Sequence, residues 1–311
     1  MQITIKHESN MNNIKASFYD PAKLNDSVPE YFRQTKNFKG IDANIEYLFN
    51  DINAEWQIIG TWVDDISKIS DKKIIYLQQE PPECKLPSID LLNQVKCAIT
   101  PFHLNHPVKQ YINSTPLPWT YDLNVLNCSK NGHTTTLASN VELNALKYKI
   151  APKKNKLCSF IVSTKSFLPG QKKRVEFAKK IMKHFNNKID YYGFGFNPVK
   201  NKKDAIDPYL FSIAIENSNY NNYWTEKIAD VFLGYTCPIY YGCSNINTYF
   251  DESSYIAIDI NNIDFSISKI EYAFNNISLY QEEKIALSRS KVLEDYNFFN
   301  IISETINKEF S

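Results

Sequence analysis

Short apolar runs recur along the first half of the chain, separated by polar segments. The strands predicted from them are Gln2–Lys6, Trp56–Trp62, Lys73–Leu77 and Val95–Thr100. Between them, Ile41–Asn53 is the segment that best fits a helix. Pro116 and Pro118 make Tyr111–Trp119 a loop or an edge segment rather than a central strand. Apolar strands that alternate with helical or loop segments predict a parallel α/β sheet.

The second half is more regular and begins after Lys147–Lys156, a charged stretch that we interpret as a solvated interdomain linker. The strands expected beyond it are Leu157–Ser163, Ile189–Tyr192, Phe211–Ile215, Pro238–Tyr241 and Tyr255–Ile260. Lys172–Phe185 has apolar residues near helical spacing, and Thr225 and Gly234 are suited to begin and end a second helix. Glu271–Phe310 is expected to be mostly helical. The fold class is therefore α/β, with two domains at residues 1–148 and 149–311.

Composition and charge indicate a packed globular protein. The chain has 311 residues, of which 43% are hydrophobic and 22% charged, and its formal net charge is +1. Such a balance gives no global field to attract nucleic acid, so we expect no nucleic-acid partner. The six cysteines form no C-x-x-C pair, which favours reduced thiols in a reducing compartment.

The N-terminal sequence MQITIKHESNMNN lacks the apolar core of a signal peptide. No apolar run approaches the roughly 20 residues that a membrane span needs. We therefore expect a cytoplasmic protein without a transmembrane segment. Peripheral contact with the inner face of the membrane stays open.

Doubly wound sheets bind ligands at the carboxyl ends of their strands, so the loops that follow strands are candidates for a site. Three such loops are Gln78–Glu83, Ser163–Arg174 and Glu216–Lys227. In the second of them, Ser163, Thr164 and the first amides of the next helix could cradle a phosphate, with Arg174 on its oxygens. Taken alone, a solvated face of Lys and Arg side chains explains the same residues.

The third loop carries polar residues at or just before a helix start: Glu216, Asn217, Ser218, Tyr223, Thr225, Glu226 and Lys227. A carboxylate at a strand end can take the two hydroxyls of a ribose. A Lys in the first turn opposes the helix dipole unless an anion lies in front of it. Taken singly, these residues are better explained as an ion pair beside a helix cap.

Glu80 ends an apolar strand, and Pro81 biases its backbone toward an extended shape. A carboxylate held in this way at a strand end could act as a general base. Glu83 is a competing carboxylate, and a polar turn explains both when they are taken alone. Other chemistries find little support, because the chain has no Walker A sequence, no G-x-S-x-G and no G-x-G-x-x-G. Asp64 and Asp65 lack further metal ligands.

The stretch YLFSIAIENSNYNNYWTEKIADVFLGYTCPIYYG at 209–242 resembles the donor-binding signature of the α-1,3/4-fucosyltransferases, glycosyltransferase family 10. Upstream, FIVST with Arg174 and the run DYYGFG resemble further family segments, and IIYLQQEPPE resembles a family strand that ends in E-x-P. The chain departs from the family at Trp224, where Val is usual, and at Thr164, where Asn is usual. The Cys-x-x-Cys pairs and membrane anchor of the secretory members are missing, as are the heptad repeats of some bacterial members.

The resemblance implies a GT-B fold, in which two Rossmann-like domains face a cleft. Residues 1–148 would bind the acceptor, and residues 149–311, with their C-terminal helices, would bind GDP-fucose. The implied reaction is inverting transfer of L-fucose to a hydroxyl of an oligosaccharide or glycoconjugate acceptor, in α-1,3 or α-1,4 linkage. Neither a metal nor a cofactor is expected.

Residue by residue, the resemblance implies that Glu80 is the general base and that Arg174 and Lys227 neutralise the departing diphosphate. Glu226 would hold the ribose. The full donor-binding set that we expect is Ser163, Thr164, Arg174, Glu216, Asn217, Ser218, Tyr223, Thr225, Glu226, Lys227 and Tyr241. Two alternatives stay open: a GT-B transferase that uses another nucleotide sugar, and a non-catalytic module that binds a glycan or a nucleotide sugar.

Overall fold

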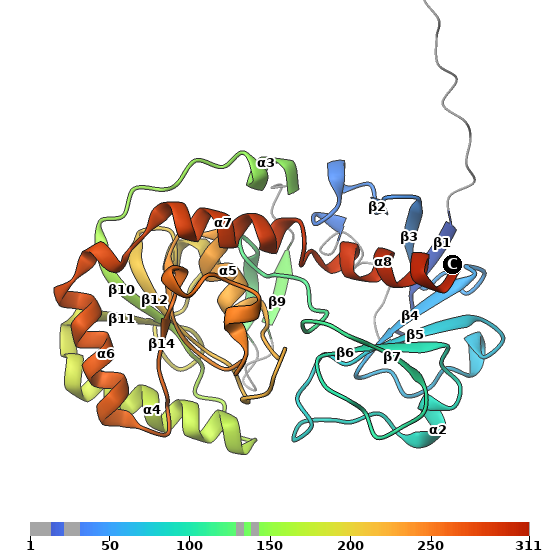
Figure 1. The fold of residues 1–311 in the computed structure, drawn as a ribbon, viewed down its shortest axis with the longest axis horizontal. Helices are drawn as coiled ribbons and strands as arrows, with labels where there is room; N and C mark the ends of the chain where they lie inside the picture. The colour runs from blue at the N-terminus through green and yellow to red at the C-terminus, as the bar shows by residue number, and fades with distance from the viewer. Residues whose placement is uncertain (1–13, 22–31, 129–133, 138–142, 311) are drawn as a thin grey trace, which may run out of the picture.

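The computed structural model describes residues 14–21, 32–128, 134–137 and 143–310 (Figure 1). Its strands form one seven-stranded sheet, one five-stranded sheet and a separate two-stranded pair. The two large sheets lie in different domains, which stand side by side in Figure 1. The two-stranded pair consists of β8 (Asn124–Cys128) and β9 (Thr134–Leu137).

The first sheet has the order β2-β3-β1-β4-β5-β6-β7, and all its pairs are parallel except β2 with β3. Its strands are β1 (Ile14–Phe18), β2 (Ile41–Asp42), β3 (Ile45–Phe49), β4 (Trp56–Gly60), β5 (Lys73–Leu77), β6 (Cys97–Thr100) and β7 (Lys109–Ile112). The predictions of β4, β5 and β6 are confirmed. Counted along the chain, the parallel strands have the order 2-1-3-4-5-6, so the winding direction reverses between β1 and β4.

The predicted helix at Ile41–Asn53 is wrong, because this segment contains β2 and β3. Ile45 and Tyr47 are buried while the positions between and after them are partly exposed, which is the period of two of a strand. Ala43 has a φ of 50° in the turn between the two strands. The predicted strand at Gln2–Lys6 lies outside the described residues.

The second sheet has the order β11-β10-β12-β13-β14 and is parallel throughout. Its strands are β10 (Lys156–Ile161), β11 (Ile189–Tyr192), β12 (Tyr209–Ile215), β13 (Cys237–Tyr241) and β14 (Ile256–Ala257). All five lie within or next to the predicted apolar runs, although β14 is shorter than its run. The order is 2-1-3-4-5 along the chain, so the winding reverses between β10 and β12.

The described helices are α2 (Ile89–Leu92), α3 (Leu143–Lys147), α4 (Pro169–Phe185), α5 (Glu226–Leu233), α6 (Ile263–Asn275), α7 (Glu282–Leu293) and α8 (Phe298–Phe310). Helix α5 begins after Thr225, whose side chain accepts a hydrogen bond from the backbone N–H of Lys227, and it ends at Gly234. The predicted cap residues, the predicted helix in α4 and the helical C-terminal segment are confirmed.

The chain crosses between the two domains twice. Trp119 and Tyr121 are buried in the core of the second domain, although they precede the linker predicted from sequence. Helix α8 returns to the first domain, where Phe299 and Ile302 are buried with Ile75 of β5. Figure 1 shows this last helix, in red, beside the strands of the first sheet. This packing differs from the predicted division at residue 148, because it gives residues near 119 to the second domain and α8 to the first.

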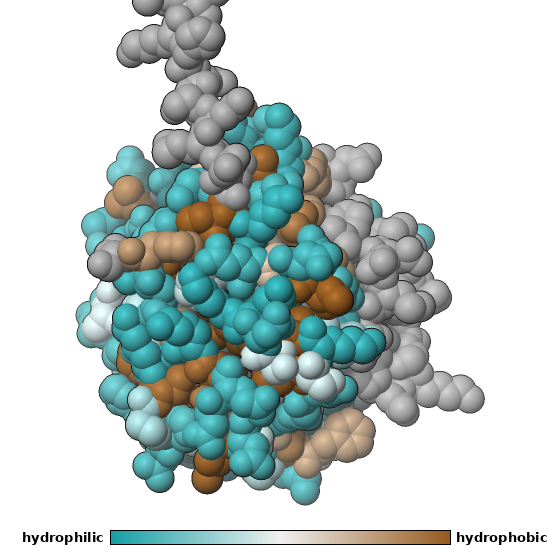
Figure 2. Space-filling model, turned by 90° about the vertical axis from the view of Figure 1, so that its right-hand side faces the viewer, coloured by the Kyte–Doolittle hydropathy of each residue, from teal (hydrophilic) through white to brown (hydrophobic). Residues whose placement is uncertain are grey.

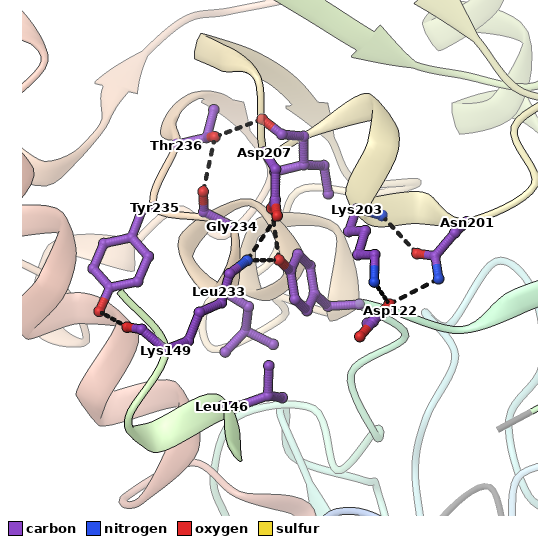
Figure 3. A network of polar contacts seen from close by, with 12 residues as sticks. Asp122, Leu146, Lys149, Asn201, Lys203, Asp207, Leu233, Gly234, Tyr235 and Thr236 are labelled. Atoms are coloured by element: carbon purple, nitrogen blue, oxygen red, sulfur yellow. Dashed lines mark hydrogen bonds and ion pairs between the residues drawn. The ribbon is translucent and has the colours of Figure 1, made fainter. Parts of the chain in front are cut away.

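Two lysines of the predicted linker fix it to the second domain, and Figure 3 shows the first of them, Lys149. Lys149 Nζ forms an ion pair with Asp207 at 2.7 Å and also donates to the hydroxyl of Tyr121. Lys154 Nζ donates to the carbonyl oxygens of Asp207 and Gly234, at 2.8 and 2.7 Å, and to the hydroxyl of Thr236 at 2.8 Å. The charged sequence therefore satisfies polar groups at one end of the second domain.

The outer face of the first domain presents mostly hydrophilic residues, with hydrophobic ones scattered among them (Figure 2). Among the described helices, none is both long enough and apolar enough to cross a bilayer. The five cysteines whose side chains are described are free thiols: Cys84, Cys97, Cys158, Cys237 and Cys243.

Candidate active site

A cavity of about 200 Å³ opens where the winding of the second sheet reverses. Its walls come from the carboxyl ends of β10 and β12 and from helices α4 and α5. The polar side chains that line it belong to Ser163, Arg174, Lys202, Ser212, Glu226 and Lys227. Four of them are site residues that the sequence predicts, and they come from two loops that are far apart in the chain.

Arg174 enters the cavity from the first turns of α4 and is largely buried. Its Nη1 donates to Asn217 Oδ1 at 2.7 Å, and its Nη2 lies 3.5 Å from Ser163 Oγ. Within the described part of the chain, its buried Nε has no hydrogen-bond partner. Burial lowers the pKa of this guanidinium, and the nearby carboxylates Glu216 and Glu226 oppose that shift. An anionic oxygen in the cavity would give the unpaired N–H an acceptor.

Lys227 is held at the start of α5 by a buried carboxylate. Its Nζ lies 3.2 Å from Glu216 Oε2 and 3.2 Å from Glu226 Oε1. Burial lowers the pKa of Lys227, but the two carboxylates outweigh burial and raise the pKa overall. The ammonium therefore stays charged. Its position follows from the local sequence, because Thr225 caps the helix two residues earlier.

Glu216 lies behind this arrangement rather than in the cavity. Its side chain is fully buried and accepts hydrogen bonds from Thr225 N at 2.9 Å and from Thr225 Oγ1 at 2.8 Å. Gly242 follows β13, and a Cβ at this position would lie 2.3 Å from Glu216 Cγ. Any larger residue there would therefore displace the side chain of Glu216. These contacts make Glu216 a residue that positions Thr225 and Lys227.

Glu226 is the carboxylate that lines the cavity. Burial raises its pKa, but Lys227 and Lys202 outweigh burial and lower the pKa to about 2, so the carboxylate remains ionised. Lys202 is a residue that sequence analysis missed. It reaches the site from the loop after β11, and its Nζ lies 2.5 Å from the buried Asp230 and 3.0 Å from Thr120 Oγ1. Only the folding of that loop brings Lys202 here, and no spacing in the sequence signals it.

Other predicted donor residues are not among those that line this cavity. Thr164 is exposed, and its backbone N–H donates to the carbonyl of Phe194. Tyr223 is buried. Tyr241 lines a separate cavity of about 560 Å³ at the end of β13. The helix start at Gly170 packs closely on the loop after β12, because a Cβ there would lie 1.6 Å from the carbonyl oxygen of Asn217. The start of α4 at Gly170 therefore packs directly against the backbone of the loop after β12.

The loop that carries Glu80 approaches the cavity from the first domain. Glu80 is partly buried, and burial raises the pKa of its carboxyl. Lys227 opposes this rise, and so does hydrogen bonding from Cys84 and Trp62, whereas Glu226 reinforces it. Charges of the second domain thus act on a carboxylate of the first, as expected for a base that faces a donor site across a cleft.

Glu83 has a different environment. It accepts hydrogen bonds from the hydroxyl of Tyr220 at 2.6 Å and from that of Ser218 at 3.2 Å, both in the second domain. Nearby, Asn222 Nδ2 donates to the carbonyl of Pro101 at 2.9 Å. Ser218, predicted to bind the donor, therefore takes part in a contact between the domains. These hydrogen bonds fix the loop of Glu80 relative to the loop that precedes α5.

The arrangement is suited to a ligand that carries both anionic oxygens and hydroxyl groups. The cations Arg174 and Lys227 enter one cavity from two helix starts, and the ionised Glu226 lines the same cavity beside Lys227. Within the described residues, no three His, Cys, Asp or Glu side chains are grouped so that they could hold a metal ion.

The site lies in a region of the chain that matches a known protein family. Residues 151–281 match the family model described as the C-terminal region of glycosyltransferase family 10 (fucosyltransferase). These residues form a glycosyltransferase family 10 domain. The cavity, Arg174 and the segment from Glu216 to Lys227 all fall inside it. The resemblance predicted from the sequence is confirmed.

One curated relative is the α-(1,3)-fucosyltransferase FucT of Helicobacter pylori, which is 34% identical over 87 residues. That alignment covers 28% of this chain and 18% of the relative, so the chain matches less than a fifth of that protein's length. The relationship supports the assignment of the family 10 domain.

Solved structures extend the likeness to both domains. The crystal structure of an α1,3-fucosyltransferase has a TM-score of 0.56 at 17% identity, covering 94% of this chain and 93% of the other. One with GDP-fucose has a TM-score of 0.53 at 18% identity, covering 91% and 90%. Anabaena HepE with UDP-glucose has a TM-score of 0.54 at 10% identity, covering 95% and 100%. At these identities the likeness concerns the fold, and the predicted GT-B arrangement is confirmed.

Proposed function

We propose that this chain is an inverting fucosyltransferase that moves L-fucose from GDP-fucose to a hydroxyl of an acceptor glycan, in α-1,3 or α-1,4 linkage. The observation that carries the proposal is the convergence of Arg174 and Lys227 on one cavity in the family 10 domain. Two cations at a sheet's switch point suit a nucleotide diphosphate, because charge grows on the diphosphate as it departs. One solved structure of similar fold is an α1,3-fucosyltransferase with GDP-fucose, which supports the choice of donor.

In the proposed reaction, the acceptor oxygen attacks the anomeric carbon of fucose while the bond from that carbon to the diphosphate breaks. Glu80 takes the proton of the attacking hydroxyl. Arg174 and Lys227 stabilise the charge on the departing GDP. A single displacement of this kind inverts the anomeric centre. Glu80 lies in the first domain and the two cations lie in the second, so base and leaving group are held on opposite sides of the fucose.

Within the donor site, Glu226 is the carboxylate that we assign to the ribose hydroxyls. It is ionised, lines the cavity and is fixed by Lys227. Asn217 orients Arg174 and stands at the phosphate end of the site. The base Glu80, the two cations and Glu226 all lie around the cavity or opposite it, so nothing in the described site suggests that catalysis has been lost. This favours a transferase over a binding module.

The first test measures donor choice and turnover. Calorimetry should show that GDP binds more tightly than UDP, and GDP-fucose should be hydrolysed slowly without acceptor. An array of oligosaccharides and glycoconjugates would then identify the acceptor, and proton NMR of the product would give its linkage and anomeric configuration. Equal affinity for GDP and UDP, or turnover of UDP-glucose instead, would favour the alternative in which the chain uses another nucleotide sugar.

A further inference from the structure

Two neighbouring lysines near the donor cavity, the cavity of about 200 Å³ between α4 and α5, each form an ion pair with a buried aspartate. Both belong to the short 3-10 helix η5 (Lys202–Ala205), which follows β11. Lys202 Nζ lies 2.5 Å from Asp230 Oδ2, and Lys203 Nζ lies 2.7 Å from Asp122 Oδ1. Of the two lysines, Lys202 is the one that lines the cavity. The two ion pairs are therefore alike in chemistry and differ in what they face.

The pair formed by Lys203 and Asp122 holds the loop in place. Asn201 precedes η5, and its Oδ1 accepts a hydrogen bond from Lys203 N at 3.0 Å (Figure 3). Its Nδ2 donates to Asp122 Oδ1 at 2.8 Å. Asp122 follows Tyr121 in the segment where the chain crosses between the domains. These bonds join η5 to the crossing segment, and they account for Lys203 without a ligand.

Asp230 lies on α5, one turn after Glu226, and its carboxylate accepts hydrogen bonds from four donors. The side chain is fully buried. Thr120 donates to it through its backbone N–H at 2.9 Å and through its hydroxyl at 2.7 Å, and Tyr121 N donates at 2.8 Å. Lys202 Nζ is the fourth donor. Because so many bonds fix this carboxylate, it can hold the ammonium of Lys202 in one orientation.

The ammonium of Lys202 has one N–H left for the cavity. An ammonium carries three N–H groups, and Lys202 uses two of them, for Asp230 Oδ2 at 2.5 Å and for Thr120 Oγ1 at 3.0 Å. Within the described residues, no acceptor takes the third. A ligand oxygen in the cavity would satisfy it.

The surroundings of Lys202 favour a neutral oxygen over a phosphate oxygen. Asp230 already balances the positive charge of Lys202, whereas the hydrogen-bond partners of Arg174 are the neutral side chains of Asn217 and Ser163. Apolar residues next to the pair, at the end of η5 and after Asp230, also line the cavity, namely Ile206 and Val231. An apolar wall with one fixed donor suits a nucleoside better than a diphosphate.

We propose that Asp230 is a positioning residue of the donor site, which holds Lys202 so that its remaining N–H donates to a neutral oxygen of the nucleoside of GDP. The ribose hydroxyls and the carbonyl of guanine are oxygens of this kind. The proposal rests on the proposed function and deepens it, because it names a group that contacts the donor outside the diphosphate. Thr120 and Tyr121 bond to the same carboxylate, so this part of the site depends on the segment that crosses between the domains.

Two double variants test the proposal. Lys202→Met with Asp230→Asn removes both charges of the cavity pair, so no buried charge is left alone. Lys203→Met with Asp122→Asn does the same to the neighbouring pair and is the matched control. In calorimetry, the first should weaken the binding of GDP roughly tenfold or more, because a charge-assisted hydrogen bond is lost, and the control should bind GDP within about twofold of the parent chain. Urea denaturation should show that both are folded.

A single variant shows whether Asp230 acts through Lys202. Asp230→Asn keeps the lysine but no longer holds it, so it should lose most of the GDP affinity that the double variant loses. Adding Lys202→Met should then change the affinity by less than about twofold, because the two effects are not independent. Full GDP affinity in Asp230→Asn, or in the folded double variant, would overturn the proposal.

Kinetics separates a nucleoside contact from a diphosphate contact. A contact that is equally strong in the ground state and the transition state raises KM and leaves kcat unchanged. In the Lys202→Met, Asp230→Asn variant, KM for GDP-fucose should therefore rise roughly tenfold while kcat stays within about twofold. A large fall in kcat would place Lys202 on the departing diphosphate and overturn the proposal. Failure of the proposed function is distinguishable, because the parent chain itself would then bind no GDP, and this inference would fall with it.

Discussion

The ammonium of Lys227 lies 3.2 Å from Glu216, a carboxylate that is itself fully buried. The same carboxylate accepts two hydrogen bonds from Thr225, the residue that caps α5. The start of this helix, the charge of Lys227 and its direction toward the cavity therefore depend on one acidic side chain. In the sequence, this motif is a run of polar residues. In the structure, Glu216 supports the site from behind, whereas Glu226 and Lys227 line the cavity.

Replacing either cation of the donor site should slow transfer strongly. Arg174→Ala or Lys227→Ala removes a charge-assisted contact to the leaving diphosphate, worth on the order of 2–4 kcal/mol in the transition state. This corresponds to a loss in kcat of roughly 30- to 1000-fold. Steady-state kinetics with GDP-fucose measures it. Lys173→Ala is a suitable control, since its Nζ contacts Asn261 at the surface. Near-normal turnover in both variants would mean that the diphosphate lies elsewhere.

Glu216 and Glu226 should respond differently to the same substitution. Glu216→Gln removes a buried charge that is paired with Lys227 and should lower the free energy of unfolding by roughly 1–3 kcal/mol, as measured by urea denaturation. Glu226→Gln should change stability less and should weaken the binding of GDP more, because Glu226 lines the cavity. Calorimetry with GDP checks the second part. If Glu226→Gln binds GDP as the parent chain does, the ribose is held by another group.

Activity should survive removal of divalent cations. In the proposed scheme, Arg174 and Lys227, which line the cavity, neutralise the charge of the diphosphate. In other transferases a metal ion performs this task. We expect transfer in excess EDTA to equal transfer in its absence, with added magnesium or manganese giving less than about a twofold change. Complete loss of activity in EDTA, restored by either ion, would count against the proposed scheme.

The sequence predicted the second domain well because its signals are local. The apolar runs of β10, β12 and β13 are continuous, and Thr225 carries its own cap signal. The helix predicted at Ile41–Asn53 was wrong because the apolar residues of this segment fit the period of a strand as well as that of a helix. Pairing of β3 with β1 favours the strand. Long-range contacts left no local signal: neither the approach of Lys202 to the cavity nor the return of α8 to the first sheet could be predicted.

From the motif, the sequence predicted which residues belong to the candidate site. It predicted less well the role that each residue has in the folded protein. Of the polar residues that line the cavity, Ser163, Arg174, Glu226 and Lys227 are ones that the sequence predicted, whereas Lys202 and Ser212 are not. Glu216, which the sequence placed with the ligand-binding residues, supports the site from behind, because β12 ends with its side chain pointing into the core at α5. Ser218 bonds to Glu83 in the other domain, a contact that depends on how the domains meet.

Glu80 should be the residue whose loss abolishes proton removal. A positioned base contributes about 10²–10⁴-fold, so Glu80→Gln should reduce transfer by that factor while the affinity for GDP stays unchanged. Glu80→Asp keeps the base one carbon farther away and should give an intermediate loss. Glu83→Gln is the matched control, because Glu83 bonds to Tyr220 and Ser218 rather than facing the cations. Normal transfer in Glu80→Gln together with a large loss in Glu83→Gln would move the assignment to Glu83.

The pH profile gives a second and independent check on Glu80. Burial raises the pKa of its carboxyl above the ordinary value. The base acts only when it is ionised, so kcat/KM should rise with pH through the raised pKa of Glu80 and then level off. The rising limb should therefore lie at higher pH than an exposed glutamate would give. In Glu80→Gln that limb should disappear from the residual activity. In Glu226→Gln it should shift to lower pH, because the negative charge of Glu226 is one of the influences that raise the pKa of Glu80. A limb that stays in place in Glu80→Gln would belong to another group, and Glu80 would then not be the base.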